Sequence, residues 1–180
     1  MRPWLNYAWN DKYASSFDQF GFGISRYTDP KGYVKNILCE GDNRLIFVKD
    51  NESGEYYAAN RNYDNAPFDT FETTVGQGYS KITSVYQKIK TEFKIFTSNQ
   101  DYSECWEVNA ENLSEEEKDF SVYIYAAIDT GSAMGAVYQR PLCRRRRRIR
   151  NRKVAYEVIY HIYESEMFAS EDLHRYGRAS

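Results

Sequence analysis

The chain has 180 residues and a net charge of −2, with 42% hydrophobic and 17% aromatic residues. This length and composition predict one domain with a real core. Eight of the 24 Lys and Arg lie in residues 144–153, which hold no acid, so the rest carries 16 basic against 26 acidic groups, a net charge of −10. An acidic body disfavours general nucleic-acid binding, because the phosphate backbone demands a distributed basic face.

Large aromatic side chains crowd the first residues of the chain, where Trp4, Tyr7, Trp9 and Tyr13 follow one another closely. Such a density at a terminus predicts a segment docked onto the domain. The alternative is a ligand surface or an interface, because Tyr and Trp stack on the apolar C–H faces of sugar rings. In that alternative, Trp4 and Trp9 are the candidate substrate-binding residues.

Short strands are predicted over the next part of the chain. Gly21–Tyr27 is expected as a strand in which the glycines permit close backbone approach or a bulge. Alternation over 34–38 predicts a second strand. Leu45–Val48 and Glu55–Ala59 are expected to form a hairpin with a longer loop. The polar segment 60–69 then predicts an irregular loop.

The clearest pattern runs from Val75 to Ile128. Apolar and polar residues alternate in four successive stretches, separated by polar turns near 87–88, 99–101 and 114–118. These stretches contain Ile82–Tyr86, Phe93–Ile95, Trp106–Val108 and Phe120–Ile128. Period-two alternation is typical of antiparallel strands with one face in the core and one in water.

A pair of glycines, Gly76 and Gly78, opens this stretch. Glycines that cradle a phosphate stand between a strand and a helix N-terminus. Here a strand pattern follows, so the pair predicts a structural turn.

The basic segment Cys143–Lys153 admits three interpretations. It is a nucleic-acid patch or localisation signal, a solvated loop, or the trace of a corrupted reading frame. Alternation resumes at once and predicts a long strand over Val154–Tyr163, followed by a connection over 164–180. The predicted organisation is therefore a sandwich over 1–142, an Arg-rich loop over 143–153 and a further strand with its connection over 154–180.

Metal and disulfide chemistry find little support. Cys39, Cys105 and Cys143 are scattered and odd in number, and His161 and His174 are the only histidines. Neither a metal site nor a disulfide framework is predicted, and no cofactor is expected. No apolar run approaches the length of a membrane span, so we expect no membrane partner and a cytoplasmic location.

Five segments carry motifs that can be compared with a known family. They are Pro3–Tyr7, Gly21–Pro30, Leu45–Tyr57, Gly76–Ile82 and Glu104–Val108. In this order they resemble motifs of the cellobiose and chitobiose phosphorylases, glycoside hydrolase family 94, formerly glycosyltransferase family 36. The family patterns carry His where Val75 stands and Gly where Phe22 stands.

The resemblance implies a fold and a reaction. The fold is an all-β antiparallel sandwich of the galactose mutarotase-like supersandwich type, of which this chain would hold the greater part but not all. In the family a catalytic (α/α)6 barrel follows, and the full-length enzymes form homodimers. They cleave β-glucosides by inverting phosphorolysis with inorganic phosphate as co-substrate. The acid Asp lies in the barrel, so no catalytic residue is assigned to this chain.

Three functions remain open from the sequence. The first is the supporting sandwich of a glycoside phosphorylase, non-catalytic alone, whose partners are a β-linked oligosaccharide and the barrel. By the resemblance, Tyr138, Gln139 and Arg140 correspond to a family loop near the active site, and Arg140 has several donors for sugar hydroxyls. The second is a stand-alone carbohydrate-binding or scaffolding sandwich. The third, the least favoured, is nucleic-acid binding through residues 144–153.

Overall fold

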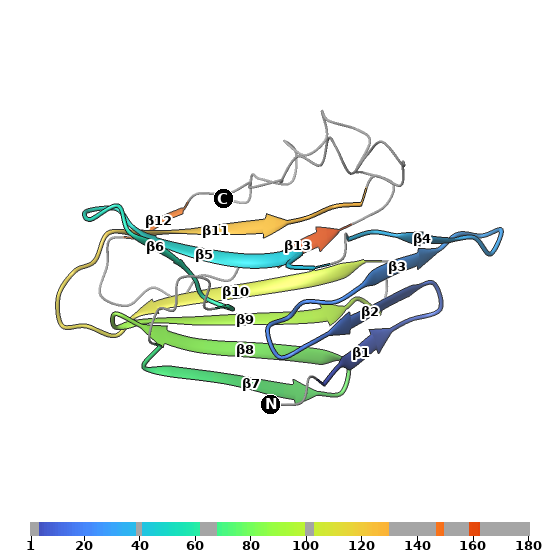
Figure 1. Ribbon diagram of the computed structural model, residues 1–180, viewed down its shortest axis with the longest axis horizontal. Coiled ribbons are helices and arrows are strands. Elements are labelled where there is room, and N and C mark those ends of the chain that lie inside the picture. Colours follow the sequence, from blue (N-terminus) through green and yellow to red (C-terminus); the bar gives the residue numbers. More distant parts are fainter. Residues whose placement is uncertain are drawn as a thin grey trace.

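The computed structural model describes residues 4–38, 41–61, 68–99, 103–129, 147–149 and 159–162. Within these ranges every regular element is a β-strand (Figure 1). The strands are β1 (Asn6–Trp9), β2 (Tyr13–Phe17), β3 (Ser25–Thr28), β4 (Val34–Asn36), β5 (Arg44–Asp50), β6 (Tyr56–Ala58), β7 (Thr70–Gly76), β8 (Tyr79–Tyr86), β9 (Ile89–Thr97), β10 (Glu104–Asn112), β11 (Phe120–Ala126), β12 (Arg147–Ile149) and β13 (Ile159–Ile162).

The strands form three sheets in which all pairs are antiparallel. Their orders are β1-β2-β3-β4, β13-β10-β9-β8-β7 and β12-β11-β5-β6. The last two sheets lie as two layers, and the β1–β4 sheet lies at one end of the five-stranded layer (Figure 1). The prediction of an all-β antiparallel sandwich is confirmed.

One hydrophobic core fills the space between the five-stranded sheet and the β12-β11-β5-β6 sheet. Ile82, Phe93 and Trp106 reach it from the five-stranded sheet, and Ile46 and Phe120 reach it from the opposite layer. Each is at most 1% exposed, and burying such a side chain contributes roughly 1.5–3 kcal/mol. The predicted inward faces of strands β8 to β11 are therefore confirmed.

Tight turns hold the meander β7-β8-β9 in register. Gly76 pairs with Tyr79 across the two-residue loop Gln77-Gly78, where Gly78 has φ of +80°. The prediction of a structural turn at these glycines is confirmed. The β8–β9 loop is also two residues long, and Gln87 and Lys88 have φ of 49° and 63°. Two successive positive φ values define a type I′ turn, whose right-handed twist suits a hairpin.

This second turn predicts a stabilising substitution. Gln87 and Lys88 carry side chains in a backbone region that favours Asn and Gly. Gln87→Asn combined with Lys88→Gly is expected to raise the free energy of unfolding by about 1 kcal/mol, measured by urea denaturation. Replacing both residues by Ala keeps the strain and is the control. A double Asn-Gly variant no more stable than the Ala control would contradict the assignment.

Two regions differ from the sequence-based expectation. The strand predicted over Gly21–Tyr27 begins only at Ser25, because Gly21 and Gly23 take positive φ values of 84° and 153°. Close backbone approach at a glycine is confirmed, since a Cβ on Gly23 would lie 2.2 Å from the Ser16 carbonyl oxygen.

The aromatic N-terminal segment forms the hairpin β1–β2, which the sequence did not predict.

Docking of that aromatic segment holds for only part of it. Tyr13 and Phe17 are buried, as is Ala8. Tyr7 and Trp9 alternate with Ala8 on β1 and are exposed. The docking prediction is therefore wrong for these two rings, because the strand's pleat turns them to the opposite side from Ala8.

The C-terminal segments are described only as strand backbones. Three residues of the Arg-rich segment expected as a loop form β12, which pairs with β11. Four residues of the predicted strand over 154–163 form β13, which pairs with β10. The remainder of 143–180 lies outside the described residues.

Candidate functional site

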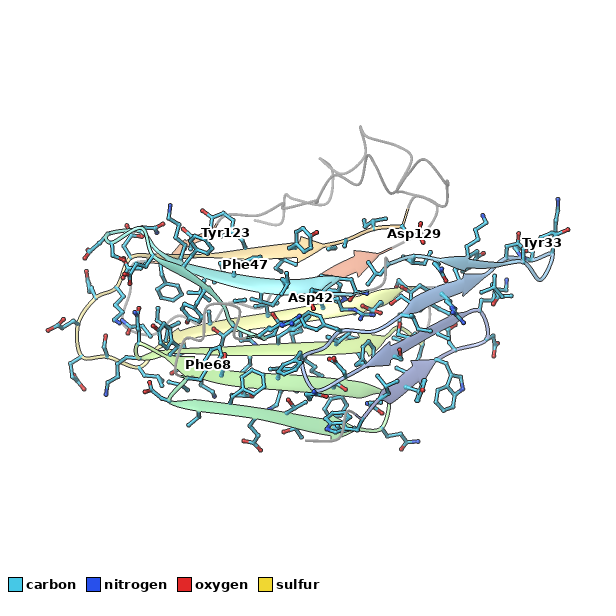
Figure 2. All side chains as sticks on the ribbon, viewed as in Figure 1. Tyr33, Asp42, Phe47, Phe68, Tyr123 and Asp129 are labelled. Carbon is cyan, nitrogen blue, oxygen red and sulfur yellow. The ribbon has the colours of Figure 1, made fainter. Side chains whose placement is uncertain are left out.

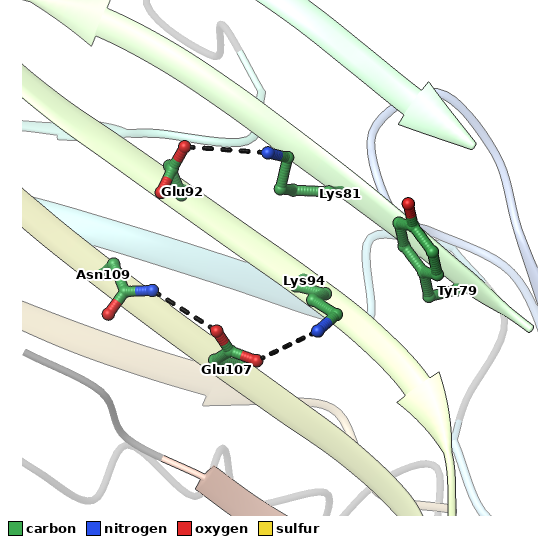
Figure 3. Close-up of a pocket in the computed structure, with 6 residues that line it drawn as sticks. All are labelled: Tyr79, Lys81, Glu92, Lys94, Glu107 and Asn109. Atoms are coloured by element: carbon green, nitrogen blue, oxygen red, sulfur yellow. Dashed lines mark hydrogen bonds and ion pairs between the residues drawn. The ribbon is translucent and has the colours of Figure 1, made fainter. Parts of the chain in front are cut away.

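The outer face of the five-stranded sheet carries a polar hollow of about 370 Å³ (Figure 3). It is formed by alternate residues of β8, β9 and β10, whose neighbours in sequence point into the core. The lining side chains are Tyr79, Lys81, Glu92, Lys94, Glu107 and Asn109. The pleat of each strand thus places the core and this hollow on opposite sides of the same sheet.

Cross-strand ion pairs organise the hollow. Lys81 Nζ lies 3.7 Å from Glu92 Oε1, and Lys94 Nζ lies 3.3 Å from Glu107 Oε2. Asn109 Nδ2 donates to Glu107 Oε1 at 3.4 Å. Figure 3 shows these contacts running across three neighbouring strands. The lining therefore carries two ammonium and two carboxylate groups whose charges cancel.

A second hollow, of about 260 Å³, shares Tyr79 and Lys94 with the first. It lies where β1 meets the ends of β8 and β9, and Trp9 and Phe96 line it. Tyr79 and Phe96 are cross-strand partners in the β8–β9 register, and the Tyr79 ring leans over Gly76 of β7. Lys94 Nζ lies 5.6 Å from the ring centroid of Tyr79 and 5.2 Å from that of Phe96.

Asparagine side chains hold β1 against this sheet. Asn6 Nδ2 donates to the Tyr79 carbonyl at 2.9 Å and to Ser80 Oγ at 3.2 Å. Asn10 Nδ2 donates to the Ser98 carbonyl at 2.9 Å. Trp9 lies between these two anchors and is 71% exposed. Its position at the rim of the second hollow is therefore fixed by the backbone, while its ring remains accessible.

A separate polar cluster is completely buried and centres on an ion pair. Arg44 Nε donates to Glu104 Oε1 at 2.7 Å, and Arg44 Nη2 donates to Glu104 Oε2 at 2.8 Å. The hydroxyls of Ser15 and Ser25 each donate to Glu104 Oε2 at 2.6 Å. Trp106 Nε1 donates to Glu104 Oε1. Both oxygens of this buried carboxylate are thus satisfied, as a buried charge requires.

This cluster joins all three sheets. Arg44 lies on β5, Glu104 on β10, and Ser15 and Ser25 on β2 and β3. Burial tends to raise the pKa of Glu104, but the Arg44 charge and the hydrogen bonds from Arg44, Ser15 and Ser25 hold it below the ordinary value of 4.5. An ionised, fully bonded carboxylate inside the fold indicates a structural role.

Sequence reasoning missed the buried ion pair, although a signal was present. Glu104 has the same strand parity as Trp106 and Val108, which are predicted to face the core. A charged residue in a core register predicts a buried partner. The partner Arg44 is 60 residues away in sequence, and no pattern in the chain connects the two.

Among the described residues, no group of three or more His, Cys, Asp and Glu gathers closely enough to hold a metal ion. Among the same residues, no helix is long and apolar enough to cross a membrane.

Comparison with known proteins identifies the fold family. A family model described as "Glycosyl hydrolase 94, supersandwich domain" matches residues 1–139. The chain belongs to this family. The resemblance drawn from the five sequence motifs is thereby confirmed.

Three related proteins act on sugars, according to their names. The chain is 30% identical to a solabiose phosphorylase of Paenibacillus borealis over 131 residues, 69% of this chain and 17% of that protein. It is 24% identical to an N,N'-diacetylchitobiose phosphorylase of Vibrio furnissii over 68% of this chain and 16% of that protein. It is 26% identical to a 3-O-beta-D-glucopyranosyl-beta-D-glucuronide phosphorylase of Paenibacillus borealis over 76% of this chain and 17% of that protein. The chain thus spans about a sixth of the length of these relatives.

The supersandwich motifs have structural explanations in this fold. Asn6, in the first motif, anchors β1 to β8. Gly76, in the fourth, ends β7, and Gly78 lies in the β7–β8 turn. Glu104, in the fifth, closes the buried cluster. The family pattern therefore marks how the three sheets are joined.

The predicted site residues fall into two groups. Trp9 lines the second hollow, whereas Trp4 is half-buried ahead of β1 and does not line either hollow. Tyr138, Gln139 and Arg140 lie outside the described residues. The two hollows on the outer sheet face were not predicted, because alternation in the sequence identifies their lining residues only as the wet side of a sheet.

Proposed function

We propose that this chain is the supporting supersandwich part of a glycoside phosphorylase and is non-catalytic alone. The observation that carries the proposal is the supersandwich match over residues 1–139, together with three related proteins that are all phosphorylases of glycosides. In the proposed whole enzyme, a catalytic barrel breaks a β-glycosidic bond. A phosphate oxygen attacks the anomeric carbon with inversion, and an acid of the barrel protonates the leaving oxygen.

The partners proposed for this part are a β-linked oligosaccharide, the barrel and a second copy of the whole enzyme. Support for a protein partner comes from β1, which is an edge strand. Tyr7 and Trp9 on this strand are exposed, and so is Leu5, the residue before it. A contiguous row of exposed apolar side chains is typical of a surface that contacts something other than water. Within the described residues, β1 pairs with β2 alone, and its other backbone edge adds a further means of association.

A chimera tests the proposed function. The matching 131-residue segment of the Paenibacillus borealis solabiose phosphorylase would be replaced by the corresponding part of this chain. We expect the chimera to release sugar 1-phosphate from solabiose and inorganic phosphate within about tenfold of the parent rate, a barrier change of about 1.4 kcal/mol. The isolated chain should release none. The control is the same enzyme with its segment deleted.

Two outcomes would overturn the proposal. Phosphate-dependent cleavage by the isolated chain would show that it is catalytic. A chimera that folds, as judged by its circular dichroism and cooperative unfolding, yet is no more active than the deletion control would show that the chain cannot serve in this role.

A further inference from the structure

The two hollows on the outer sheet face are adjacent, because Tyr79 and Lys94 line both, and together they are called the groove. One end is aromatic and carries Trp9 and Phe96. The other end is polar and carries Glu107 and Asn109. The groove therefore offers an elongated surface that changes from apolar to polar along its length.

The aromatic end presents one ring that the fold leaves uncovered, that of Trp9, while the Tyr79 and Phe96 rings are half-buried. Trp9 is 71% exposed, although burial of a Trp side chain is among the larger apolar contributions available to a protein. The Asn6 and Asn10 anchors fix its strand against the sheet, so the exposed ring is not carried by a loose terminus. A preformed aromatic surface of this kind suits a ligand with an apolar face.

The charges in the groove select against ionic ligands. Lys94 lies against Glu107, and Lys81 shares Glu92 Oε1 with Lys90, whose Nζ lies 3.1 Å from the same oxygen. Each ammonium of the lining therefore has a carboxylate beside it, which disfavours a phosphate or carboxylate ligand. Glu107 is held by Lys94 and Asn109, and this disfavours a cationic ligand. The lining residues offer hydrogen-bond donors and acceptors whose formal charges cancel, Lys81 and Lys94 against Glu92 and Glu107.

A neutral sugar chain has the complementary chemistry. Its rings present C–H faces that stack on aromatic side chains, and its hydroxyls both donate and accept hydrogen bonds. We propose that this groove binds a short neutral oligosaccharide, with one ring stacked on Trp9 and a later ring bonded by Glu107 and Asn109. This inference deepens the proposed function, on which it rests for an oligosaccharide partner, by giving that partner a place on the supersandwich. The binding involves no bond cleavage and needs no catalytic barrel.

Isothermal titration of the whole chain with cellotetraose and with chitotetraose tests the inference. We expect at least one to bind with Kd on the order of 1 mM, unaffected by inorganic phosphate. Trigalacturonic acid, the anionic probe, should bind at least about tenfold more weakly, a difference of about 1.4 kcal/mol. No binding of either neutral probe at about 10 mM, or tighter binding of the anionic one, would overturn the proposal.

Substitutions locate the binding. Trp9→Ala should weaken the affinity for the neutral probe at least about tenfold. Trp9→Phe keeps a ring and should weaken the affinity less. Asn109→Ala should weaken the affinity by removing a hydrogen-bonding group at the polar end of the groove. The matched control is Tyr33→Ala, which removes a ring that is 67% exposed at the tip of the β3–β4 hairpin (Figure 2). Equal affinities for the chain and for Trp9→Ala would overturn the inference. Because Trp9 is outside the core, thermal unfolding of Trp9→Ala should match that of the unmodified chain.

A failure of groove binding is distinguishable from a failure of the proposed function. Sugar-phosphate release by the chimera depends on the fold of the supersandwich, whereas groove binding depends on Trp9. An active chimera together with an isolated chain that binds neither neutral probe would overturn groove binding and leave the proposed function standing, and an inactive chimera together with an isolated chain that binds would do the reverse.

Discussion

Replacing Glu104 by Gln is expected to lower the free energy of unfolding by about 3–5 kcal/mol. The amide has the size of the carboxylate but no charge, so the fully buried Arg44 guanidinium loses the carboxylate that balances its charge. Ser15 and Ser25 also lose a charged acceptor, and such hydrogen bonds are stronger than neutral ones. Urea denaturation of the variant beside the unmodified chain measures the effect.

The matched control lies three residues along the same strand. Glu107 forms an ion pair with Lys94 on the outer face, where its side chain is 23% exposed. Because water replaces a lost partner there, Glu107→Gln should cost only about 0–1 kcal/mol. If Glu104→Gln costs no more than Glu107→Gln, the buried cluster does not join the sheets in the way described.

Acid provides an independent measure of the same pair. The folded pKa of Glu104 lies below 4.5, because the Arg44 charge and hydrogen bonds outweigh the effect of burial. Its contribution to stability is therefore complete above pH 4.5 and is lost as the pH falls through the lowered folded value. Urea midpoints should fall in that acid range for the unmodified chain and fall less for Glu104→Gln. The pKa of Asp50 is also lowered, mainly by a backbone hydrogen bond from Ser53. Asp50 is present in the unmodified chain and in Glu104→Gln, so its effect on the acid dependence of stability is common to the two proteins.

The meander was predictable because its physical cause is local. Ile82, Phe93 and Trp106 lie on the apolar faces of alternating strands. A strand with such alternation buries its apolar face in only one of the two possible orientations, and this fixes its register. The turns at Gly78 and Lys88 follow from short polar interruptions between such strands. In this region, each residue's neighbours in sequence carry the information needed to place it.

The side-chain contacts that connect the sheets were not predictable from the local sequence. Arg44 and Glu104 meet only after three sheets have assembled, and the sequence shows neither the pairing nor the serines that complete it. The orientation of Trp9 depends on Asn6, whose amide bonds to a strand more than 70 residues away. Aromatic content alone therefore predicted a docked segment, whereas the anchor and the pleat decide which rings are buried.

The other large effect is expected at Gly23, where β2 and the chain entering β3 come closest. Gly23 has φ of 153°, a region almost restricted to glycine, and an added Cβ would lie 2.2 Å from the Ser16 carbonyl oxygen. That oxygen belongs to the backbone of β2, so it cannot move aside without disturbing the strand. Gly23→Ala is expected to lower the free energy of unfolding by about 3 kcal/mol or more, measured by urea denaturation.

Gly32→Ala separates the two causes of that loss. Gly32 has a positive φ of 86°, but nothing lies within 4 Å of its added Cβ. It carries the backbone strain without the collision, and its substitution should cost only about 1–2 kcal/mol. The difference between the two variants then reports the collision with Ser16 together with the more restricted φ of Gly23. Equal losses would mean that Gly23 approaches Ser16 less closely than the structure has it.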